Sequence, residues 1–193
     1  MPIPYEAQPA TTTSVEENVA WEIAGQAAYV TPPIRGGTNP FGAGIGARAG
    51  VTWGGGWYLG GTFTYFLGGK DVDVSYRAIF YGIDFGYGFR FPAFGSSTFT
   101  LRPKIGAGDA VVYYTDPSLA ADVVTSASGS STSDTISVNN LYVQPGVTAM
   151  LEAAGHFVAV DASALMLPGI AYGGADVTTW LSYGVQGELG FRF

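Results

Sequence analysis

The most regular feature of the chain is an alternation of apolar and polar residues, which holds for most of the sequence beyond residue 18. Successive side chains of a β-strand point to opposite faces, so this alternation predicts strands with one apolar and one polar face. The clearest run is 78–91, whose apolar face has no polar interruption and consists of Ile79, Tyr81, Ile83, Phe85, Tyr87, Phe89 and Phe91. In all, the pattern predicts eight strands, at residues 19–29, 42–53, 57–67, 78–91, 98–114, 141–151, 157–167 and 178–193.

The connections between these runs alternate between short and long. Residues 54–56, 92–97 and 154–156 form short links, whereas 30–41, 68–75, 115–140 and 168–177 form longer ones. Short turns on one rim and long loops on the other are typical of barrels that cross an outer membrane. The pattern predicts an all-β fold, an eight-stranded antiparallel up-and-down transmembrane β-barrel, over residues 19–193. Residues 1–18 are polar and contain three prolines, so we expect a flexible N-terminal tail.

Composition narrows the functional classes. The chain is 47% hydrophobic but only 12% charged, about half of the usual share for a soluble domain. No apolar run approaches the roughly 20 residues that a membrane-spanning helix needs, so a membrane-spanning solution would have to be a closed barrel. The net charge of −7 argues against nucleic acid as a partner. The chain has no cysteine, which excludes disulfides, thiol nucleophiles and Cys-ligated zinc.

The charged residues within the strands lie almost entirely on the polar faces. Five are acidic and five basic, so their charges sum to zero although the chain is acidic: Glu22, Asp84, Glu152, Asp161 and Glu188, with Arg48, Arg90, Arg102, Lys104 and Arg192. A closed lumen favours such a balance, because an unpaired buried charge is costly. We therefore predict a lumenal ion-pair network, with the apolar faces toward lipid. A soluble, lipocalin-like barrel is the alternative, and it would place the same residues on the opposite sides.

Aromatic residues cluster near the strand ends. Those that we expect at the short-turn rim are Trp21, Trp53, Trp57, Phe89, Phe91, Phe99, Phe191 and Phe193. Tyr29, Tyr65 and Tyr113 are expected at the long-loop rim, with Tyr183 somewhat below it. Two aromatic girdles are what the two membrane–water interfaces select.

The chain ends in Gly190-Phe191-Arg192-Phe193, on the eighth predicted strand. With the strand number and the asymmetry of the connections, this ending resembles the outer-membrane eight-stranded barrels of the OmpA/OmpX-like superfamily, over the transmembrane barrel only. The resemblance implies insertion in the bacterial outer membrane with both termini and the short turns periplasmic and the longer loops extracellular. It also implies recognition of Phe191 and Phe193 by the barrel-assembly machinery. Outer-membrane lipids and lipopolysaccharide are the other partners that we expect, together with an envelope protein.

Glycines on the polar faces alternate with large residues such as Tyr58, Phe66 and Tyr142, a pattern that favours a filled lumen over a wide pore. The sequence thus favours a barrel with a closed, ion-paired lumen and a structural or surface-interaction role through its extracellular loops, above all residues 115–140. A narrow channel or transporter for a small or hydrophobic solute is the alternative function.

Candidate catalytic and ligand-binding residues are few. Small outer-membrane barrel enzymes that act on lipid A use a histidine on the outer side, whereas the one histidine here, His156, falls in a short turn on the opposite rim. The sequence therefore predicts no catalytic residues. Gly42–Gly46 lacks the helix that completes a phosphate loop, and 71–75 lacks the glycine and distal glutamate of a calcium loop. No cofactor or metal site is expected.

Overall fold

The computed structural model describes residues 19–31, 41–68, 70–71, 74–115, 135–170 and 178–193. The predicted tail, 1–18, and most of the long connections lie outside the described residues. Within the described part of the chain, no helix is long and apolar enough to cross a membrane.

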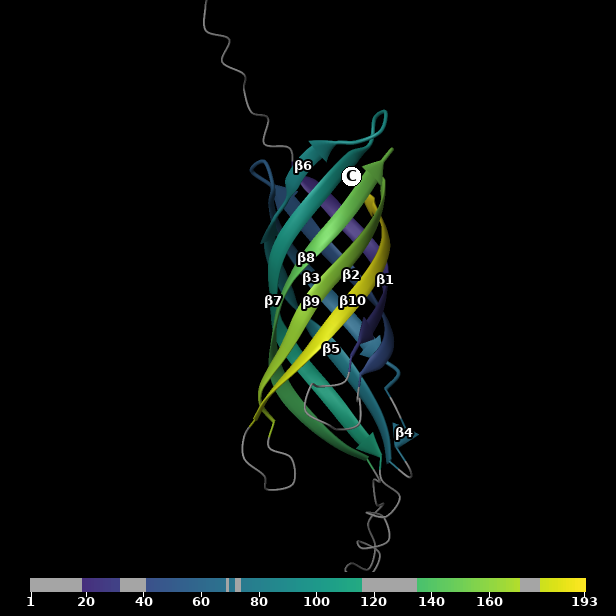
Figure 1. Ribbon diagram of the computed structural model, residues 1–193, viewed down its shortest axis with the longest axis vertical. Coiled ribbons are helices and arrows are strands. Elements are labelled where there is room, and N and C mark those ends of the chain that lie inside the picture. The colour runs from purple at the N-terminus through teal and green to yellow at the C-terminus, as the bar shows by residue number, and fades with distance from the viewer. Residues whose placement is uncertain (1–18, 32–40, 69, 72–73, 116–134, 171–177) are drawn as a thin grey trace, which may run out of the picture.

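All regular structure in the described residues is β-strand (Figure 1). The strands are β1 (Ala20–Val30), β2 (Gly42–Trp53), β3 (Trp57–Phe66), β4 (Lys70–Asp71), β5 (Val74–Tyr87), β6 (Phe89–Pro92), β7 (Thr98–Thr115), β8 (Thr135–Ala153), β9 (His156–Ile170) and β10 (Thr178–Arg192). β6 continues β5 after a break at Gly88, and β4 is a two-residue segment paired only with the start of β5. The remaining wall therefore consists of eight antiparallel strands, as the alternation predicted.

The sheet closes on itself. Each strand pairs with its neighbours in sequence, and β1 pairs with β10 from Glu22↔Arg192 to Val30↔Gly184. Closure is continued to the chain end by the backbone of Phe193, whose N–H donates to the Trp21 carbonyl at 3.0 Å and whose carbonyl accepts from the Trp21 N–H at 2.7 Å. A closed barrel leaves no open sheet edge within the wall itself.

The two rims of the barrel differ, as predicted. The short turns, β6 and the C-terminal end of β10 lie at one end of the barrel, and β4 lies at the other (Figure 1). The β8–β9 turn is a two-residue hairpin in which Ala154 and Gly155 both have positive φ, 50° and 77°. Both signs match a type I′ turn, the connection whose twist fits that of a hairpin.

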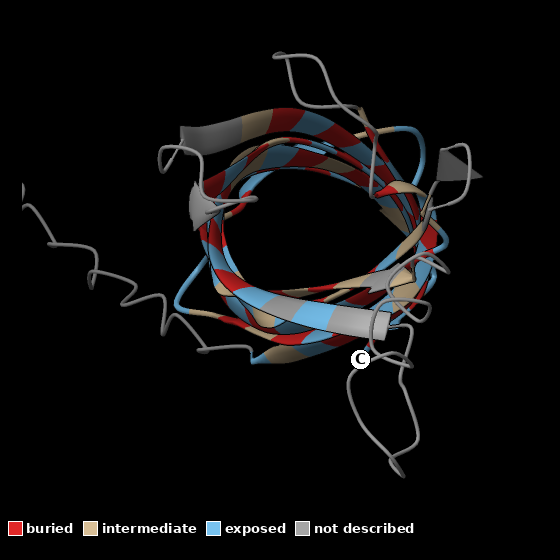
Figure 2. Ribbon diagram, turned by 90° about the horizontal axis from the view of Figure 1, so that it is seen from below, coloured by how far each residue is buried: buried red, intermediate tan, exposed pale blue. Residues whose placement is uncertain are grey.

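Viewed along its axis, the wall is a ring in which buried and exposed residues alternate (Figure 2). The interior is filled by aromatic rings that lie over glycines of neighbouring strands. The ring of Tyr58 covers Gly50 and Gly60, and that of Tyr142 covers Gly82 and Gly108, so that a Cβ at any of these glycines would collide with the ring. This pairing of rings with glycines explains why the lumen faces are so rich in both residue types.

Candidate functional site

The outer face of the wall is apolar over most of its height, and the outward Asp109 is an exception that accepts a hydrogen bond from Tyr81 at 2.8 Å. Ile45 and Ile83 are 62% exposed and Leu189 is 68% exposed, and similar residues occupy the outward positions of every wall strand. Asp84, next to Ile83, is only 2% exposed. This placement is opposite to that of a soluble barrel, whose apolar face would be the core, and a continuous apolar shell of this kind exceeds what a soluble monomer exposes.

Eight charged side chains of the described residues are buried inside the barrel. Four are acidic and four basic, so this buried set is neutral: Glu22, Asp84, Asp161 and Glu188, with Arg48, Arg102, Lys104 and Arg192. They come from strands all around the ring, because the inward positions of β1, β2, β5, β7, β9 and β10 meet in the lumen. Charges removed from water in this way need opposite charges within contact distance.

Glu22 is the centre of the first cluster. Its carboxylate accepts two hydrogen bonds from Arg102, at 2.7 Å from Nη2 and 3.0 Å from Nη1, and a third from Thr52 Oγ1 at 3.0 Å. Arg48 Nη2 lies 3.6 Å from the same carboxylate and 2.7 Å from Glu188 Oε2. The two-point contact with Arg102 joins β7 to β1 across the lumen, in the geometry that guanidinium–carboxylate pairs favour.

The ring of Tyr58 lies beneath both guanidinium groups of this cluster. The Arg102 guanidinium carbon lies 3.9 Å from the centre of the Tyr58 ring, and that of Arg48 lies 5.2 Å from it. A cation over a desolvated ring is stabilised by the negative face of the ring. Sequence reasoning treated Tyr58 only as a space-filling residue and so missed this role.

Lys104 forms the second cluster. Its Nζ lies 3.1 Å from Asp84 Oδ2 and 3.1 Å from Asp161 Oδ2, so one ammonium group bridges carboxylates of β5 and β9. Thr148 Oγ1 donates a further hydrogen bond to Asp161 Oδ2 at 2.7 Å. The positive charge of Lys104 thus compensates the negative charges of Asp84 and Asp161, which would otherwise repel each other.

Three members of the predicted network lie at the short-turn rim. Arg192 Nη1 contacts Glu152 Oε2 at 3.0 Å, and the Glu152 side chain is 24% exposed. Arg90 is exposed and forms no ion pair within 4.0 Å between described residues, although its charge acts on Glu152, so its place in the network stays a prediction. Arg90 is exposed because β6 pairs only with β7, which leaves it without a second neighbouring strand to cover it.

The long-loop end of the lumen contains an apolar cluster instead of charges. The rings of Phe41, Phe66 and Phe80 meet edge to face, with centroids 5.0–6.0 Å apart. Tyr142 stacks on Phe80 at 5.1 Å, and Leu165 and Leu167 complete this aromatic plug. The prediction of a filled lumen did not foresee that the filling is divided into an apolar and a charged level.

Phe41 was predicted to lie in a loop, yet it is fully buried. Strict alternation would turn Phe41 outward, because it is one position out of phase with the inward residues of β2. Gly42 has φ of 63°, which breaks the alternation and allows the Phe41 ring to enter the lumen. The glycine directly after an isolated phenylalanine was the available signal.

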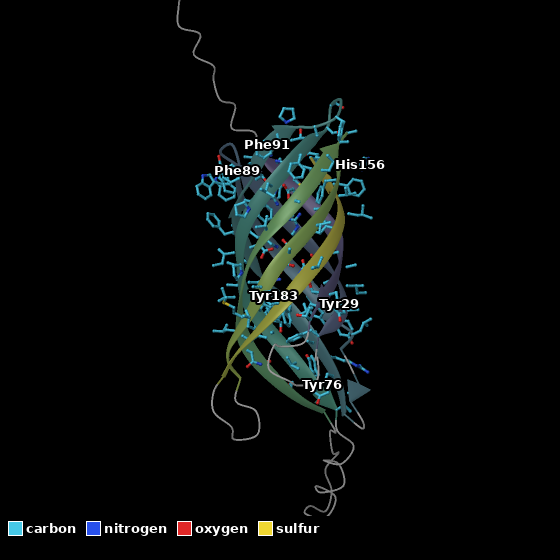
Figure 3. All side chains as sticks on the ribbon, viewed as in Figure 1. Tyr29, Tyr76, Phe89, Phe91, His156 and Tyr183 are labelled. Atoms are coloured by element: carbon cyan, nitrogen blue, oxygen red, sulfur yellow. The ribbon has the colours of Figure 1, made fainter. Side chains whose placement is uncertain are left out.

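The aromatic residues predicted for the short-turn rim lie on the outer face there. Trp21, Trp57, Phe89, Phe91, Phe99, Phe191 and Phe193 are exposed, and Trp53 is half-buried. Phe89 and Phe91 lie near this end of the barrel, and Tyr29, Tyr183 and Tyr76 lie toward the other (Figure 3). Trp57 stacks on Phe85 with ring centroids 5.3 Å apart, which links β3 to β5 on the outer face.

His156 lies at the short-turn rim, on the outer face (Figure 3). Its ring packs edge to face on Phe191, with centroids 4.9 Å apart, and it has no hydrogen-bond partner among the described residues. Likewise, no group of three or more His, Asp or Glu side chains in the described ranges is arranged to hold a metal ion.

The wall is not of equal height around the ring. β7 and β8 contain 18 and 19 residues, against 10 to 12 in β1, β2 and β3, and Figure 1 shows them reaching farther at the long-loop end. β8 pairs with β7 along this whole extension, up to Thr115↔Thr135, but with β9 only from Val143 onward. Residues 135–142 of β8 therefore have a strand partner on one side only, among the described residues.

Prolines lie where the β8–β9 ladder is interrupted and just beyond its last pair among the described residues. Pro145 falls between the pairs Gly146↔Ser163 and Val143↔Met166, and Pro168 follows two residues after Met166. Proline has no N–H to donate, and in sheets it is confined to edges and irregularities. The β8–β9 pairing among the described residues therefore ends on the long-loop side, at the end of the lumen that contains the aromatic plug.

No family model matches the chain, and no curated protein matches it. Solved structures do match, among them Ail, the attachment invasion locus protein of Yersinia pestis, with a TM-score of 0.52 at 14% identity, covering 92% of this chain and 99% of that one. Neisserial surface protein A matches with a TM-score of 0.51 at 11% identity over 90% and 95% of the two chains. A major outer membrane protein from Thermus thermophilus matches with a TM-score of 0.51 at 11% identity over 91% and 100%. The chain thus has the closed eight-stranded antiparallel barrel fold of outer-membrane proteins.

Proposed function

We propose that the chain is an integral outer-membrane protein with a closed lumen, which binds a partner at the cell surface by strand addition to the free edge of β8. In this proposal the short turns and both termini face the periplasm, and the extended end of β5, β7 and β8 faces the exterior. Among the described residues, 135–142 of β8 pair only with β7, and this one-sided pairing is the observation that carries the proposal.

Membrane insertion is supported by the apolar outer shell and by the barrel fold. Lipid is the environment in which exposed residues such as Ile83 and Leu189 are stable, and only closed barrels satisfy the backbone of strands there. Outer-membrane lipids, with lipopolysaccharide on the outer side, are accordingly its proposed surroundings. Phe191 and Phe193 are the proposed recognition end for the barrel-assembly machinery.

A closed lumen is supported by its two filled levels. A solute would have to displace the aromatic plug and then separate the charged clusters around Glu22 and Lys104. No described feature of the interior favours the narrow channel, so we do not propose it. Catalysis is not proposed either, because His156 has no nucleophile or orienting group beside it among the described residues.

Strand addition is supported by the geometry of the edge. Eight residues of extended backbone span about 25 Å, and on one side their N–H and C=O groups have no ladder partner among the described residues. Such an edge is a template for pairing, and soluble domains usually block it. An extended segment of a partner would complete the ladder through main-chain hydrogen bonds. The names of Ail and of Neisserial surface protein A also describe attachment and a surface location, which agrees with a surface-interaction role.

The proposal is tested by proline substitution along the free edge. Ser137 and Val138 are adjacent, so one of the two N–H groups points toward β7 and the other toward the free edge. Cells that display the wild-type chain, S137P or V138P are compared for binding of fluorescent heptapeptides rich in Val and Thr. We expect binding by the wild type and its loss in the proline variant that still folds with an intact β7–β8 ladder.

The matched control is a proline at Ala162, which lies in β9 within the paired wall. A162P should impair barrel folding, measured by heat-modifiable gel migration, and should not act selectively on peptide binding. Equal peptide binding by the wild type and both edge variants would contradict strand addition.

A further inference from the structure

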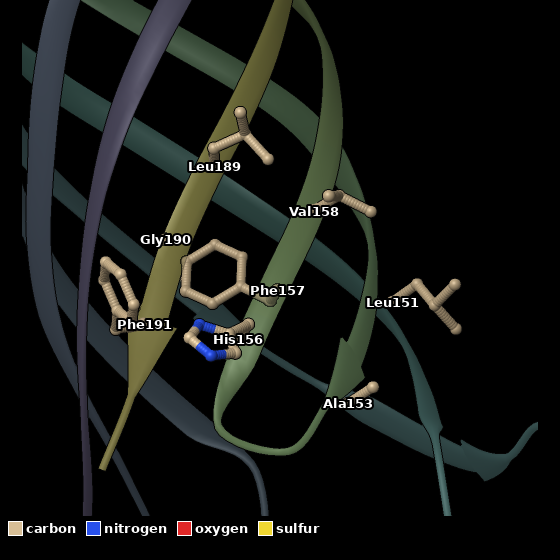
Figure 4. Close-up of a pocket in the computed structure, with 8 residues that line it drawn as sticks. All are labelled: Leu151, Ala153, His156, Phe157, Val158, Leu189, Gly190 and Phe191. Carbon is tan, nitrogen blue, oxygen red and sulfur yellow. The ribbon is translucent and has the colours of Figure 1, made fainter. Parts of the chain in front are cut away.

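An apolar groove of about 350 Å³ lies on the outer face at the short-turn end, across β8, β9 and β10 (Figure 4). Two rows of outward residues form it. Leu151, Val158 and Leu189 are register partners in one row, and Ala153, His156 and Phe191 are partners in the row next to the turn.

The groove exists because Ala153 is a small residue on the outer face and leaves room beside Leu151 and His156 at the turn end. Gly190 is an inward position, so only its backbone lines the groove, and the ring of Phe157 packs against it from the lumen side. The groove is therefore an apolar depression with aromatic and aliphatic walls, open to the surroundings of the barrel.

His156 is the one polar side chain that lines the groove. Its ring is held by the edge-to-face contact with Phe191, and among the described residues neither ring nitrogen has a hydrogen-bond partner. The imidazole thus offers a free N–H at the rim, on the outer face and at the end where Phe89 and Phe91 also lie (Figure 3). Aromatic residues at this level mark the interface between hydrocarbon and headgroups.

We propose that this groove binds one glycerophospholipid of the periplasmic leaflet, with an acyl chain along Leu151, Val158 and Leu189 and the phosphate hydrogen-bonded to His156. The proposal rests on the membrane placement given above, but not on strand addition at β8. The hydrogen-bond donor selects the phosphate, because an imidazole N–H donates to an anionic oxygen and the remaining lining is apolar. The lining itself selects an acyl chain rather than a polar ligand.

The single histidine makes the test direct, since its ring gives one unambiguous NMR signal. The folded chain in phosphate-free detergent micelles is titrated with short-chain phosphatidylglycerol and, separately, with the matched diacylglycerol, which lacks the phosphate. We expect a saturable shift of the His156 ring signal with phosphatidylglycerol. The diacylglycerol should bind about tenfold more weakly, which corresponds to the loss of one hydrogen bond to a charged group.

Three variants and one control variant separate the parts of the site. A153W fills the turn end of the groove and should abolish saturable binding, whereas A162W, on the outer face of β9 away from the groove, should not. H156Q keeps an N–H donor and should retain phosphatidylglycerol in native mass spectra. H156F keeps a ring against Phe191 but has no donor, so its retention of phosphatidylglycerol should fall about tenfold. Heat-modifiable gel migration verifies that each variant is folded.

Equal affinity for the two lipids, or unchanged binding in A153W, would overturn the proposal. So would self-association that A153W weakens and phosphatidylglycerol does not affect, because a second copy would then be the occupant. Failure of peptide binding at the β8 edge would leave these results unchanged, so the two proposals fail separately.

Discussion

Replacing Lys104 by methionine tests whether the second charged cluster stabilises the barrel. The lysine bridges Asp84 and Asp161 at 3.1 Å each, and all three side chains are almost completely buried. Methionine matches the lysine stem in length but has no charge. The K104M variant thus leaves two carboxylates facing each other in the lumen with their shared cation removed.

The expected cost follows from this burial. Removing one partner of a buried ion pair costs about 3–5 kcal/mol, because the other charge stays desolvated. With a urea dependence of about 2 kcal/mol per molar, the unfolding midpoint should fall by about 2 M. Neutralising all three groups, in K104M/D84N/D161N, should return the stability to within about 1 kcal/mol of the wild type, because no charge is then unpaired. Thr148 can still donate to the amide oxygen at position 161.

Tryptophan fluorescence during urea unfolding in phospholipid vesicles measures the three midpoints, with heat-modifiable migration as a second readout. A loss below about 1 kcal/mol in K104M would refute the reasoning, since the two acids would then be solvated or neutral without the lysine. A triple variant as unstable as K104M would refute it as well, because the lost stability would then come from packing rather than charge.

Three further tests have definite expected outcomes. A154N should raise the free energy of unfolding by about 0.5–1 kcal/mol, because Ala154 has a positive φ that asparagine tolerates better. A lower free energy of unfolding would contradict the turn assignment. G60V should cost at least about 2 kcal/mol, because a Cβ there collides with Tyr58, whereas G25V should be tolerated since no atom lies within 4 Å; equal losses would contradict the packing. Y58F should be within about 0.5 kcal/mol of the wild type, because the Tyr58 hydroxyl has no hydrogen-bond partner among the described residues. Y58L should lose about 2–4 kcal/mol with the ring beneath Arg102, and comparable midpoints for the two variants would show that the ring has no such role.

The wall could be predicted from the sequence because alternation is a local signal with a direct physical cause. The strand ends at Trp53 and Trp57, on either side of a short turn, and the outward direction of Ile83 follow from it. The structure confirms both. The extension of β8 was not predicted. Residues 135–140 contain Thr, Ser and two Asn, a content typical of a loop, and the alternating Ile136 and Val138 were the signal that pointed to a strand.

The interior was harder to predict than the wall. Alternation assigns a residue to the inward face but not to a level along the barrel axis, so the division into an aromatic plug and charged clusters was invisible. Arg90 shows the same limit. Alternation assigns it to the inward face, but it does not tell where the neighbouring strand ends, and Arg90 is exposed on a segment that pairs only with β7. Phe41 depended on one backbone torsion at Gly42, which no period-two pattern contains.

Contact between the apolar outer face and hydrocarbon is measured directly by spin-label accessibility. The chain has no cysteine, so a single nitroxide can be attached at Ile23, Ile83 or Leu189, with Phe94 in an exposed short turn as the aqueous control. In reconstituted vesicles, we expect the three wall sites to be accessible to oxygen and protected from a water-soluble nickel chelate, and the label at Phe94 to show the reverse. Nickel accessibility at the wall sites equal to that at Phe94 would contradict membrane insertion.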